Sequence, residues 1–167
     1  MEALPLRAGG EMDSIIDRYQ NTVYGLALAR TGNRADADDV FQEVFLAYCQ
    51  CGKTFQDEEH RKAWLLRTTV NQSRRVTASS WRQKTVPLSE REDVPVQFQE
   101  PEENEVWTAL QSLAEDYRLP IYLFYFQELS TQEIAKILAI RPGAVRMRLT
   151  RGREQLREKL KGEFFDE

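Results

Sequence analysis

Apolar residues recur at helical spacing along nearly the whole chain, and this periodicity restricts the possible folds more than any other feature. Ile15, Tyr19 and Val23, for example, lie four positions apart, as the side chains on one helix face do. No stretch of useful length alternates apolar and polar residues in the manner of a half-buried strand. The sequence therefore predicts an all-α fold, in which amphipathic helices bury their apolar faces against one another.

Residues 86–104 interrupt the helical pattern. Pro87, Pro95 and Pro101 lie there among many acidic residues and few large apolar ones. Proline lacks a backbone donor, and a chain rich in like charges repels itself and extends. Because 167 residues suffice for two small domains, we predict two small helical domains joined by a flexible acidic linker. Their bounds are residues 1–85, the linker 86–104, and residues 105–167.

The second domain contains a pattern typical of a helix-turn-helix motif. Pro120 is expected to start a short apolar helix, and Ser130 with Glu133 forms a capping box for another helix over 131–138. A three-residue connection then leads to Pro142, a favourable first residue for the last helix. Two helices joined by so short a turn are the helix-turn-helix pattern.

The net charge of −4 conceals two basic blocks. Residues 60–84 contain seven basic residues and no acidic one, and residues 130–161 contain nine basic and three acidic ones. The segment 36–59 carries seven acids and one base, and 86–118 carries nine acids and two bases. Two basic blocks separated by an acidic one indicate two contacts with a polyanion. Ordinary solvated helix faces are the alternative.

The last helix has the layout of a recognition helix. Val145 and Leu149 belong to its inward stripe, whereas Met147, Thr150 and Arg151 lie on the opposite side. Arginine suits guanine because its fork spans O6 and N7, and flanking cations suit phosphates. An arginine-rich surface helix without a ligand is the alternative. The candidate DNA-contacting residues are Arg146, Met147, Arg148, Thr150, Arg151 and Arg153.

The helix expected to begin near Asp57 carries a second candidate surface. Trp64, Arg67 and Asn71 share one face of it. Aromatic and arginine planes beside amide donors suit the unstacked bases of a single strand. A core position for Trp64 is an equally good interpretation. The candidate residues are Lys62, Trp64, Arg67, Asn71, Arg74 and Arg75.

The helix expected between Asn33 and Gly52 indicates a protein partner. Its apolar stripe includes Val40, Val44 and Tyr48, and Leu46 lies among polar residues on the other side. A leucine in that setting indicates a docking face, although single exposed leucines are common. The other members of this face are Asp39, Gln42 and Glu43.

No pattern in the sequence indicates catalysis. His60 is the only histidine, so no histidine-based metal cluster can form, and Cys49 and Cys51 fall on different sides of a helix. No glycine-rich phosphate loop is present. We therefore expect no enzymatic activity, no catalytic residue, no metal and no cofactor. The longest apolar stretch is too short to span a membrane and no secretory signal is found, so we expect a cytoplasmic protein without direct membrane insertion.

Three motifs, in order along nearly the whole chain, resemble the bacterial RNA polymerase sigma factors of the extracytoplasmic-function (ECF) group. Asp39, Gln42, Glu43 and Phe45 are similar to the family's D-x-x-Q-E-x-F motif. The stretch KAWLLRTTVN at 62–71 is similar to its W-L-x-R-x-x-x-N pattern. The segment ELSTQEIAKILAIRPGAVRMRLTRGREQLREKL at 128–160 resembles its fourth region.

The resemblance implies a sigma factor that binds core RNA polymerase, through the β′ clamp and the β subunit, and directs promoter-specific transcription initiation. It implies that 62–71 melts and reads the −10 element, that 53–61 captures a flipped base, and that the last helix reads the −35 element. An anti-sigma factor is a further implied partner. Met147 and Thr150 differ from the residues more common in the family at those places. The polymerase-binding residues it implies are Asp39, Gln42, Glu43, Phe45 and Leu46.

Two other functions fit parts of the sequence. A free-standing helix-turn-helix regulator that binds operator DNA without polymerase would use 130–161 but would leave 64–75 and the Leu46 face without a role. Such a regulator usually forms a homodimer on a palindromic site. A protein-interaction module without nucleic acid is the third hypothesis.

Overall fold

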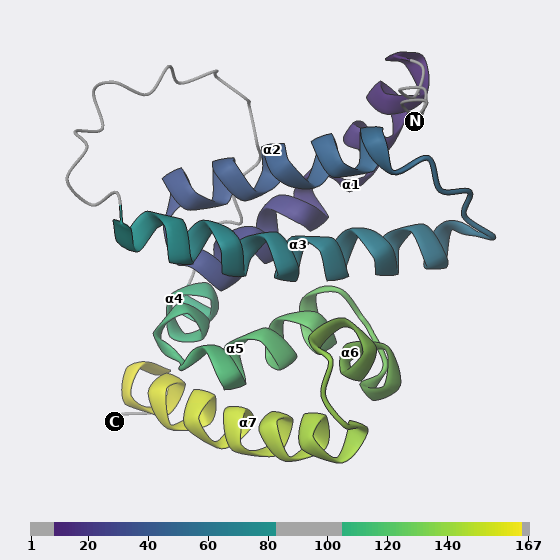
Figure 1. Cartoon of the computed structure of the whole chain (residues 1–167). Helices are drawn as coiled ribbons and strands as arrows, with labels where there is room; N and C mark the ends of the chain where they lie inside the picture. The colour runs from purple at the N-terminus through teal and green to yellow at the C-terminus, as the bar shows by residue number, and fades with distance from the viewer. Residues whose placement is uncertain (1–8, 83–104, 165–167) are drawn as a thin grey trace.

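The computed structural model describes residues 9–82 and 105–164, and within these ranges the chain is helical with no strand. The helices are arranged in two stacked units, which Figure 1 shows one above the other. The predicted all-α fold class is confirmed. The predicted linker, 86–104, lies outside the described residues.

The N-terminal unit is a bundle of three long helices. The side chain of Asn33 accepts a hydrogen bond of 2.8 Å from the backbone N–H of Asp36 and caps the second helix, as predicted. Gly32 and Gly52 follow the first two helices with φ of 77° and 62°, a left-handed conformation that favours glycine. The helices are α1 (Gly9–Thr31), α2 (Arg34–Cys51) and α3 (Glu58–Arg82).

The C-terminal unit contains the predicted helix-turn-helix motif. The capping box of Ser130 and Glu133 is formed, Ala139 ends the helix in a left-handed conformation, and the last helix begins at Pro142. The elements are α4 (Glu105–Ser112), α5 (Glu115–Ile121), the π-helical η2 (Tyr122–Phe126), α6 (Thr131–Leu138) and α7 (Pro142–Phe164).

The start of α5 differs from the prediction. The helix begins at Glu115, and Pro120 lies inside it rather than at its first position. Glu115 and Asp116 stabilise the first turn, because carboxylates interact favourably with a helix N-terminus. The proline removes a bond to the carbonyl of Asp116, an exposed residue that water can reach.

One apolar core joins the two units. Leu26 and Ala29 of α1 and Leu66 and Val70 of α3 belong to the same buried cluster as side chains of the C-terminal unit. Burying a leucine or valine stabilises the packing by roughly 1.5–3 kcal/mol. The second unit therefore packs directly on the first. The sequence predicted two domains on a flexible linker, without a shared core between them. Its contributions to the cluster include Trp107, Leu110, Leu123, Ile134 and Ile137.

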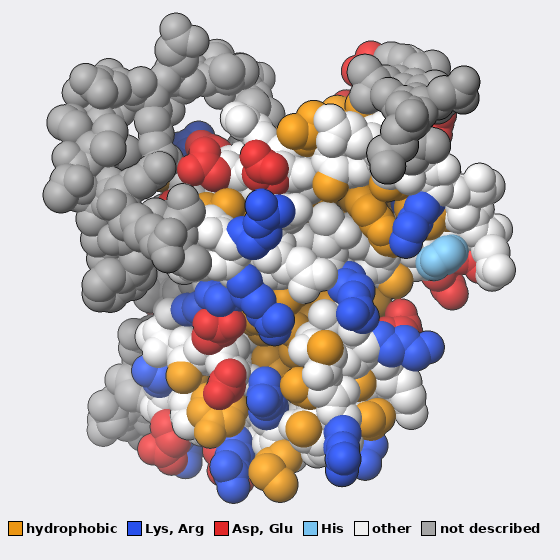
Figure 2. All heavy atoms as spheres, viewed as in Figure 1, with side chains coloured by type: hydrophobic (Ala, Val, Ile, Leu, Met, Phe, Trp, Pro, Cys, Tyr) orange, Lys and Arg blue, Asp and Glu red, His pale blue; other side chains and the backbone are white. Residues whose placement is uncertain are grey.

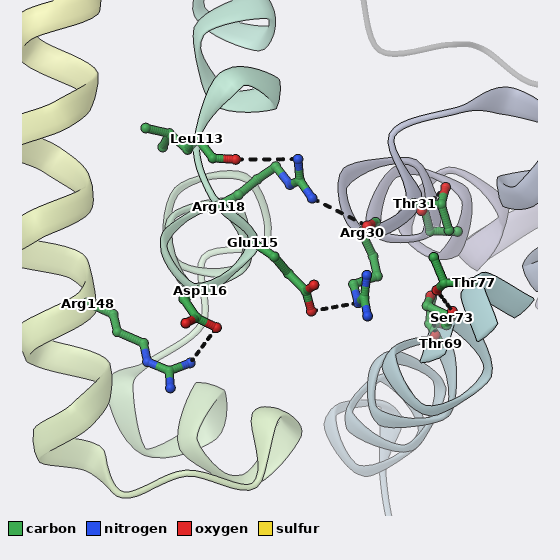
Figure 3. Close-up of polar contacts among 11 residues, drawn as sticks. Arg30, Thr31, Thr69, Ser73, Thr77, Leu113, Glu115, Asp116, Arg118 and Arg148 are labelled. Atoms are coloured by element: carbon green, nitrogen blue, oxygen red, sulfur yellow. Dashed lines mark hydrogen bonds and ion pairs between the residues drawn. The ribbon is translucent and has the colours of Figure 1, made fainter. Parts of the chain in front are cut away.

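Polar contacts also cross this junction (Figure 3). Arg118 of α5 donates to the backbone carbonyl of Arg30, at 3.4 Å, near the C-terminal end of α1. A helix end leaves such carbonyls without intrahelical partners, so the guanidinium caps it. The Nε atom of Arg30 lies 2.8 Å from the carboxylate of Glu115. Burial lowers the pKa of Arg118.

The two units approach each other closely at Gly25 of α1. This residue is buried, and a Cβ atom there would clash with the hydroxyl oxygen of Tyr122. The close approach of α1 and η2 therefore requires a residue without a side chain at position 25.

Two polar side chains are buried on α3. The hydroxyls of Thr69 and Ser73 donate to carbonyls one turn earlier, so these polar groups are satisfied within the helix (Figure 3).

Candidate nucleic-acid interface

The first half of α7 carries an open face. Arg146, Met147, Thr150 and Arg151 are exposed, and the Met147 side chain retains 57% of its accessible surface. Val145 and Leu149 anchor the opposite side of the helix in the core. The structure thus brings four of the six predicted residues of this helix onto one surface.

Arg148 and Arg153 are placed differently from these four residues. Arg148 is half-buried, and its Nη1 lies 3.8 Å from a carboxylate oxygen of Asp116 (Figure 3). Contacts of this kind at a surface contribute little free energy, so Arg148 can exchange Asp116 for a phosphate. Arg153 donates to the hydroxyl of Tyr125 at 2.6 Å, and its guanidinium lies over the Phe124 and Tyr125 rings. Arg153 thereby fastens α7 to η2.

Part of the basic face of α3 contacts the C-terminal unit. Arg67, Asn71, Arg74 and Arg75 are exposed, and Lys62 is half-buried. Arg67 donates to the backbone carbonyl of Lys136 on α6, at 2.9 Å, and Lys62 donates to the carbonyl of Gln127 at 3.3 Å. In Figure 2, basic side chains lie along the boundary between the two units. The six predicted residues therefore share one helix, but the C-terminal unit occupies part of their surface.

Trp64 packs on the N-terminal core and is also partly accessible. Its ring packs edge-on against Tyr48 and Phe55, with centroid distances of 5.9 Å to each, so it is attached to the N-terminal core. The side chain is only half-buried. It also lines a cleft of about 430 Å³ between α3 and α6, together with Arg67 and Lys136. This cleft is bounded by both units.

The predicted docking face of α2 is at the surface, with one exception. Gln42 and Glu43 are exposed and Leu46 is 50% exposed, while Asp39 is half-buried. Phe45 is 5% exposed and lies 4.7 Å from Phe41, ring centroid to ring centroid. It supports the face from the core and does not form part of the surface.

Sequence reasoning missed a polar cluster at the start of α3. Glu58 accepts hydrogen bonds from Tyr19 and Arg61 and pairs with Arg18 at 3.0 Å. The hydrogen bond from Tyr19 is the main cause that lowers the pKa of Glu58 to about 2, and burial with this contact raises the pKa of Tyr19 to about 12. Tyr19 and Arg18 are distant from Glu58 in sequence, so the acidic first turn was the only signal. The cluster attaches α1 to the start of α3.

Tyr125 and Asp116 were also missed, because each contacts an arginine of α7 from a separate element. Within the ranges 9–82 and 105–164, no group of three or more His, Cys, Asp or Glu residues could hold a metal ion. None of the helices in these ranges is long and apolar enough to cross a membrane.

Comparisons with known proteins agree with the motifs. Sigma-70 region 2 matches residues 15–83, and Sigma-70 region 4 matches residues 103–156. The ECF RNA polymerase sigma-E factor of Haemophilus influenzae is 32% identical, over 87% of this chain and 85% of that protein. The sigma factor SigW of Bacillus subtilis is 29% identical, over 91% of each chain. SigE of Mycolicibacterium smegmatis is 31% identical over 89% of this chain, which spans 61% of that protein.

Two solved structures have the same fold. The sigma factor RpoE of Bartonella quintana, in complex with the anti-sigma factor NepR, superposes with a TM-score of 0.66 at 22% identity, covering 90% of this chain and 97% of that one. CnrH, in complex with the cytosolic domain of CnrY, gives 0.65 at 21% identity, covering 93% and 90%. The two-unit helical architecture is therefore shared with these proteins.

Proposed function

Because the chain belongs to the extracytoplasmic-function group of bacterial RNA polymerase sigma factors, we propose that it binds core RNA polymerase and directs promoter-specific transcription initiation. The observation that carries this proposal is the open face of α7, where arginines flank the exposed Met147 and Thr150 over a buried stripe. A DNA-reading helix needs such a face, because the side chains that reach base edges have to be accessible from the groove.

The C-terminal unit reads the −35 element as duplex. Arg146 and Arg151 contact guanine, since a guanidinium can donate to O6 and N7 together. Arg148 contacts a phosphate after leaving Asp116. Arg153 has a supporting role, because its contact with Tyr125 holds the helix in place.

The N-terminal unit holds the melted −10 element. Trp64 and Arg67 offer planes for unstacked bases, and Asn71 offers an amide beside them. Arg74, Arg75 and Lys62 supply charge for the backbone. A surface that binds only unstacked bases shifts the duplex toward its melted form by differential affinity. The Arg67 side chain is exposed, and in this proposal it gives up its hydrogen bond to the carbonyl of Lys136 when it contacts a base.

In this proposal, α2 binds the polymerase. Leu46 supplies apolar area, and Asp39, Gln42 and Glu43 supply polar contacts for the β′ clamp. Phe45 keeps the helix in position from the core. The β subunit is the second polymerase contact of the proposal, reached by the C-terminal unit.

An anti-sigma factor is a further partner in this proposal. RpoE of Bartonella quintana was solved with an anti-sigma factor, and this chain has the same fold. The proposed action is binding without catalysis, metal or cofactor, in the cytoplasm, where polymerase and promoter DNA are found.

Transcription in vitro with purified core polymerase tests the proposal. We expect promoter-specific transcripts only when the protein is added. A titration of promoter duplex, with the protein alone and then with core polymerase at equal salt, separates this function from a free-standing regulator. Tight sequence-specific binding by a homodimer without polymerase would contradict the sigma proposal.

A further inference from the structure

The open face of α7 has an apolar centre. Met147 is 57% exposed and has no hydrogen-bond donor. The hydroxyl of Thr150 donates to the backbone carbonyl of Arg146 at 3.0 Å, so its hydrogen is used within the helix. The methyl group of Thr150 and the thioether of Met147 therefore remain for contact with a ligand.

The helix places these two side chains between the arginines. At 3.6 residues per turn, successive residues are rotated by about 100°. The order around the face is therefore Arg146, Thr150, Met147, Arg151. Residues three or four apart are also neighbours along the axis, so the side chain of Met147 lies beside those of Thr150 and Arg151. The result is an apolar strip with a guanidinium on each side.

The major groove offers one apolar group, the 5-methyl group of thymine. Apart from small C–H edges, the other groups that bases present there are hydrogen-bond donors and acceptors, and an apolar side chain facing one of these would leave it unsatisfied. A thioether is flexible and polarisable, so it adapts well to a methyl group. The strip therefore suits thymine and disfavours cytosine at the same place.

We propose that Met147 and Thr150 select thymine through its 5-methyl group, in the base pairs of the −35 element that lie between those contacted by Arg146 and Arg151. This inference rests on the proposed function and assigns the bases that the α7 face selects. It makes the two side chains specificity-determining residues, and the hydroxyl of Thr150 a group that only fixes the rotamer.

The test uses the holoenzyme of core polymerase and the full chain. A duplex library with a randomised −35 element is first selected for binding. Each thymine of the selected element is then replaced singly by deoxyuridine, which removes the methyl group and keeps the base pair. We expect at least one replacement to weaken binding about fourfold, as the loss of one buried methyl-sized group predicts.

Matched variants assign the effect to the strip. Met147→Ala, or Thr150→Ser, which retains the hydroxyl and lacks the methyl group, should bind thymine and deoxyuridine duplexes equally at the affected position. Thr150→Val, which retains the methyl group, should keep the discrimination. Arg151→Ala should lose preference for guanine and retain the response to the thymine methyl group.

The outcomes separate the inference from the proposed function. Specific binding that is insensitive to deoxyuridine at every position, a selected element without thymine, or discrimination that survives in both Met147→Ala and Thr150→Ser would overturn the inference and leave the sigma function intact. A holoenzyme that selects no −35 element would overturn both.

Discussion

The two helices proposed to read DNA, α3 and α7, are similar in length, at 25 and 23 residues, but differ in access. The reading face of α7 is open along its first half. On α3, Arg67 and Lys62 already donate to backbone carbonyls of the C-terminal unit. The same packing explains both observations, because α6 lies on α3 while α7 is on the far side of its unit (Figure 1).

The two proposed DNA-binding surfaces are therefore unequally accessible in this structure. The proposed duplex-reading face of α7 needs no rearrangement, whereas full use of the proposed single-strand face of α3 requires that the junction open and that Lys62 and Arg67 leave their carbonyl partners. Opening exposes part of a shared core, including Leu66 and Val70. The free energy for it has to come from binding elsewhere, and docking of α2 on polymerase is the proposed source.

The largest loss of function is expected from a substitution in the docking face of α2, because both proposed DNA contacts depend on polymerase binding. Leu46→Arg should abolish association with core polymerase, because it buries an unpaired charge in the interface, at a cost of about 2–5 kcal/mol. A pull-down with purified core polymerase measures this. Asn21→Arg, which adds the same charge at an exposed position of α1, is the matched control. Wild-type recovery of a correctly folded Leu46→Arg protein, judged by circular dichroism, would refute the docking face.

A substitution that opens the junction should make the proposed single-strand face of α3 more nearly as accessible as the duplex-reading face of α7. Gly25→Val places a side chain against Tyr122 and should lower the free energy of unfolding by about 1–3 kcal/mol, as overpacking does. It should also raise the affinity of the free protein for a −10 single strand. Gly10→Val, in the same helix but in open space, is the control for helix propensity. If hydrogen exchange shows an opened junction and single-strand binding is unchanged, α6 does not restrict α3.

The open face of α7 should respond to single substitutions with loss of specificity. Arg146→Ala and Arg151→Ala should each lose about 1–3 kcal/mol of discrimination at the −35 element, as the loss of a bidentate base contact does. Arg148→Ala should weaken binding to all sequences alike. Competition between cognate and scrambled duplexes for the holoenzyme measures this, with Gln155→Ala, an exposed residue of α7, as control. Equal losses on both duplexes in all three variants would refute the assigned face.

The smallest effect, a change in unfolding free energy, is expected from the Glu58 cluster, which attaches α1 to the start of α3. The pKa of Glu58 is lowered from 4.5 to about 2, so its contacts stabilise the fold above pH 4.5 and are lost as the pH falls toward 2. The side chain is 50% exposed, so we expect less than about 1 kcal/mol. Glu58→Gln should remove this part of the pH dependence of the unfolding free energy, and Glu59→Gln should retain it. Identical curves for Glu58→Gln and the wild type would show that the cluster adds no stability.

Local signals in the sequence predicted the elements well. The capping box at Ser130 and the start of α7 at Pro142 were correct, because caps and prolines act within one turn of the backbone. The start of α5 was wrong because Pro120 was given more weight than the acidic pair before it. The periodicity of α7 also placed Met147 and Thr150 on the outer face.

Contacts between distant segments could not be predicted. The apolar residues Leu26 and Leu66 marked helix faces that must be covered, but periodicity does not identify what covers them. The same limit applies to Arg153, whose partner Tyr125 is 28 residues away in sequence. Trp64 remained ambiguous because its surroundings come from three separate segments.

Four hydrogen bonds between described residues on the two sides of the junction have a backbone carbonyl as acceptor. Lys62 and Arg67 donate to carbonyls of the C-terminal unit, and Gln111 and Arg118 donate to the carbonyls of Leu28 and Arg30 in the N-terminal unit. Backbone carbonyls do not titrate and are present whatever the side chain, so substitutions at Leu28, Gln127 or Lys136 leave these acceptors in place. Neither acidification nor substitution at the acceptor positions removes these four acceptors, which differ in this respect from the carboxylate of Glu115 that pairs with Arg30. A competing ligand for the donors themselves breaks these hydrogen bonds, and a DNA phosphate is such a ligand for Lys62 and Arg67.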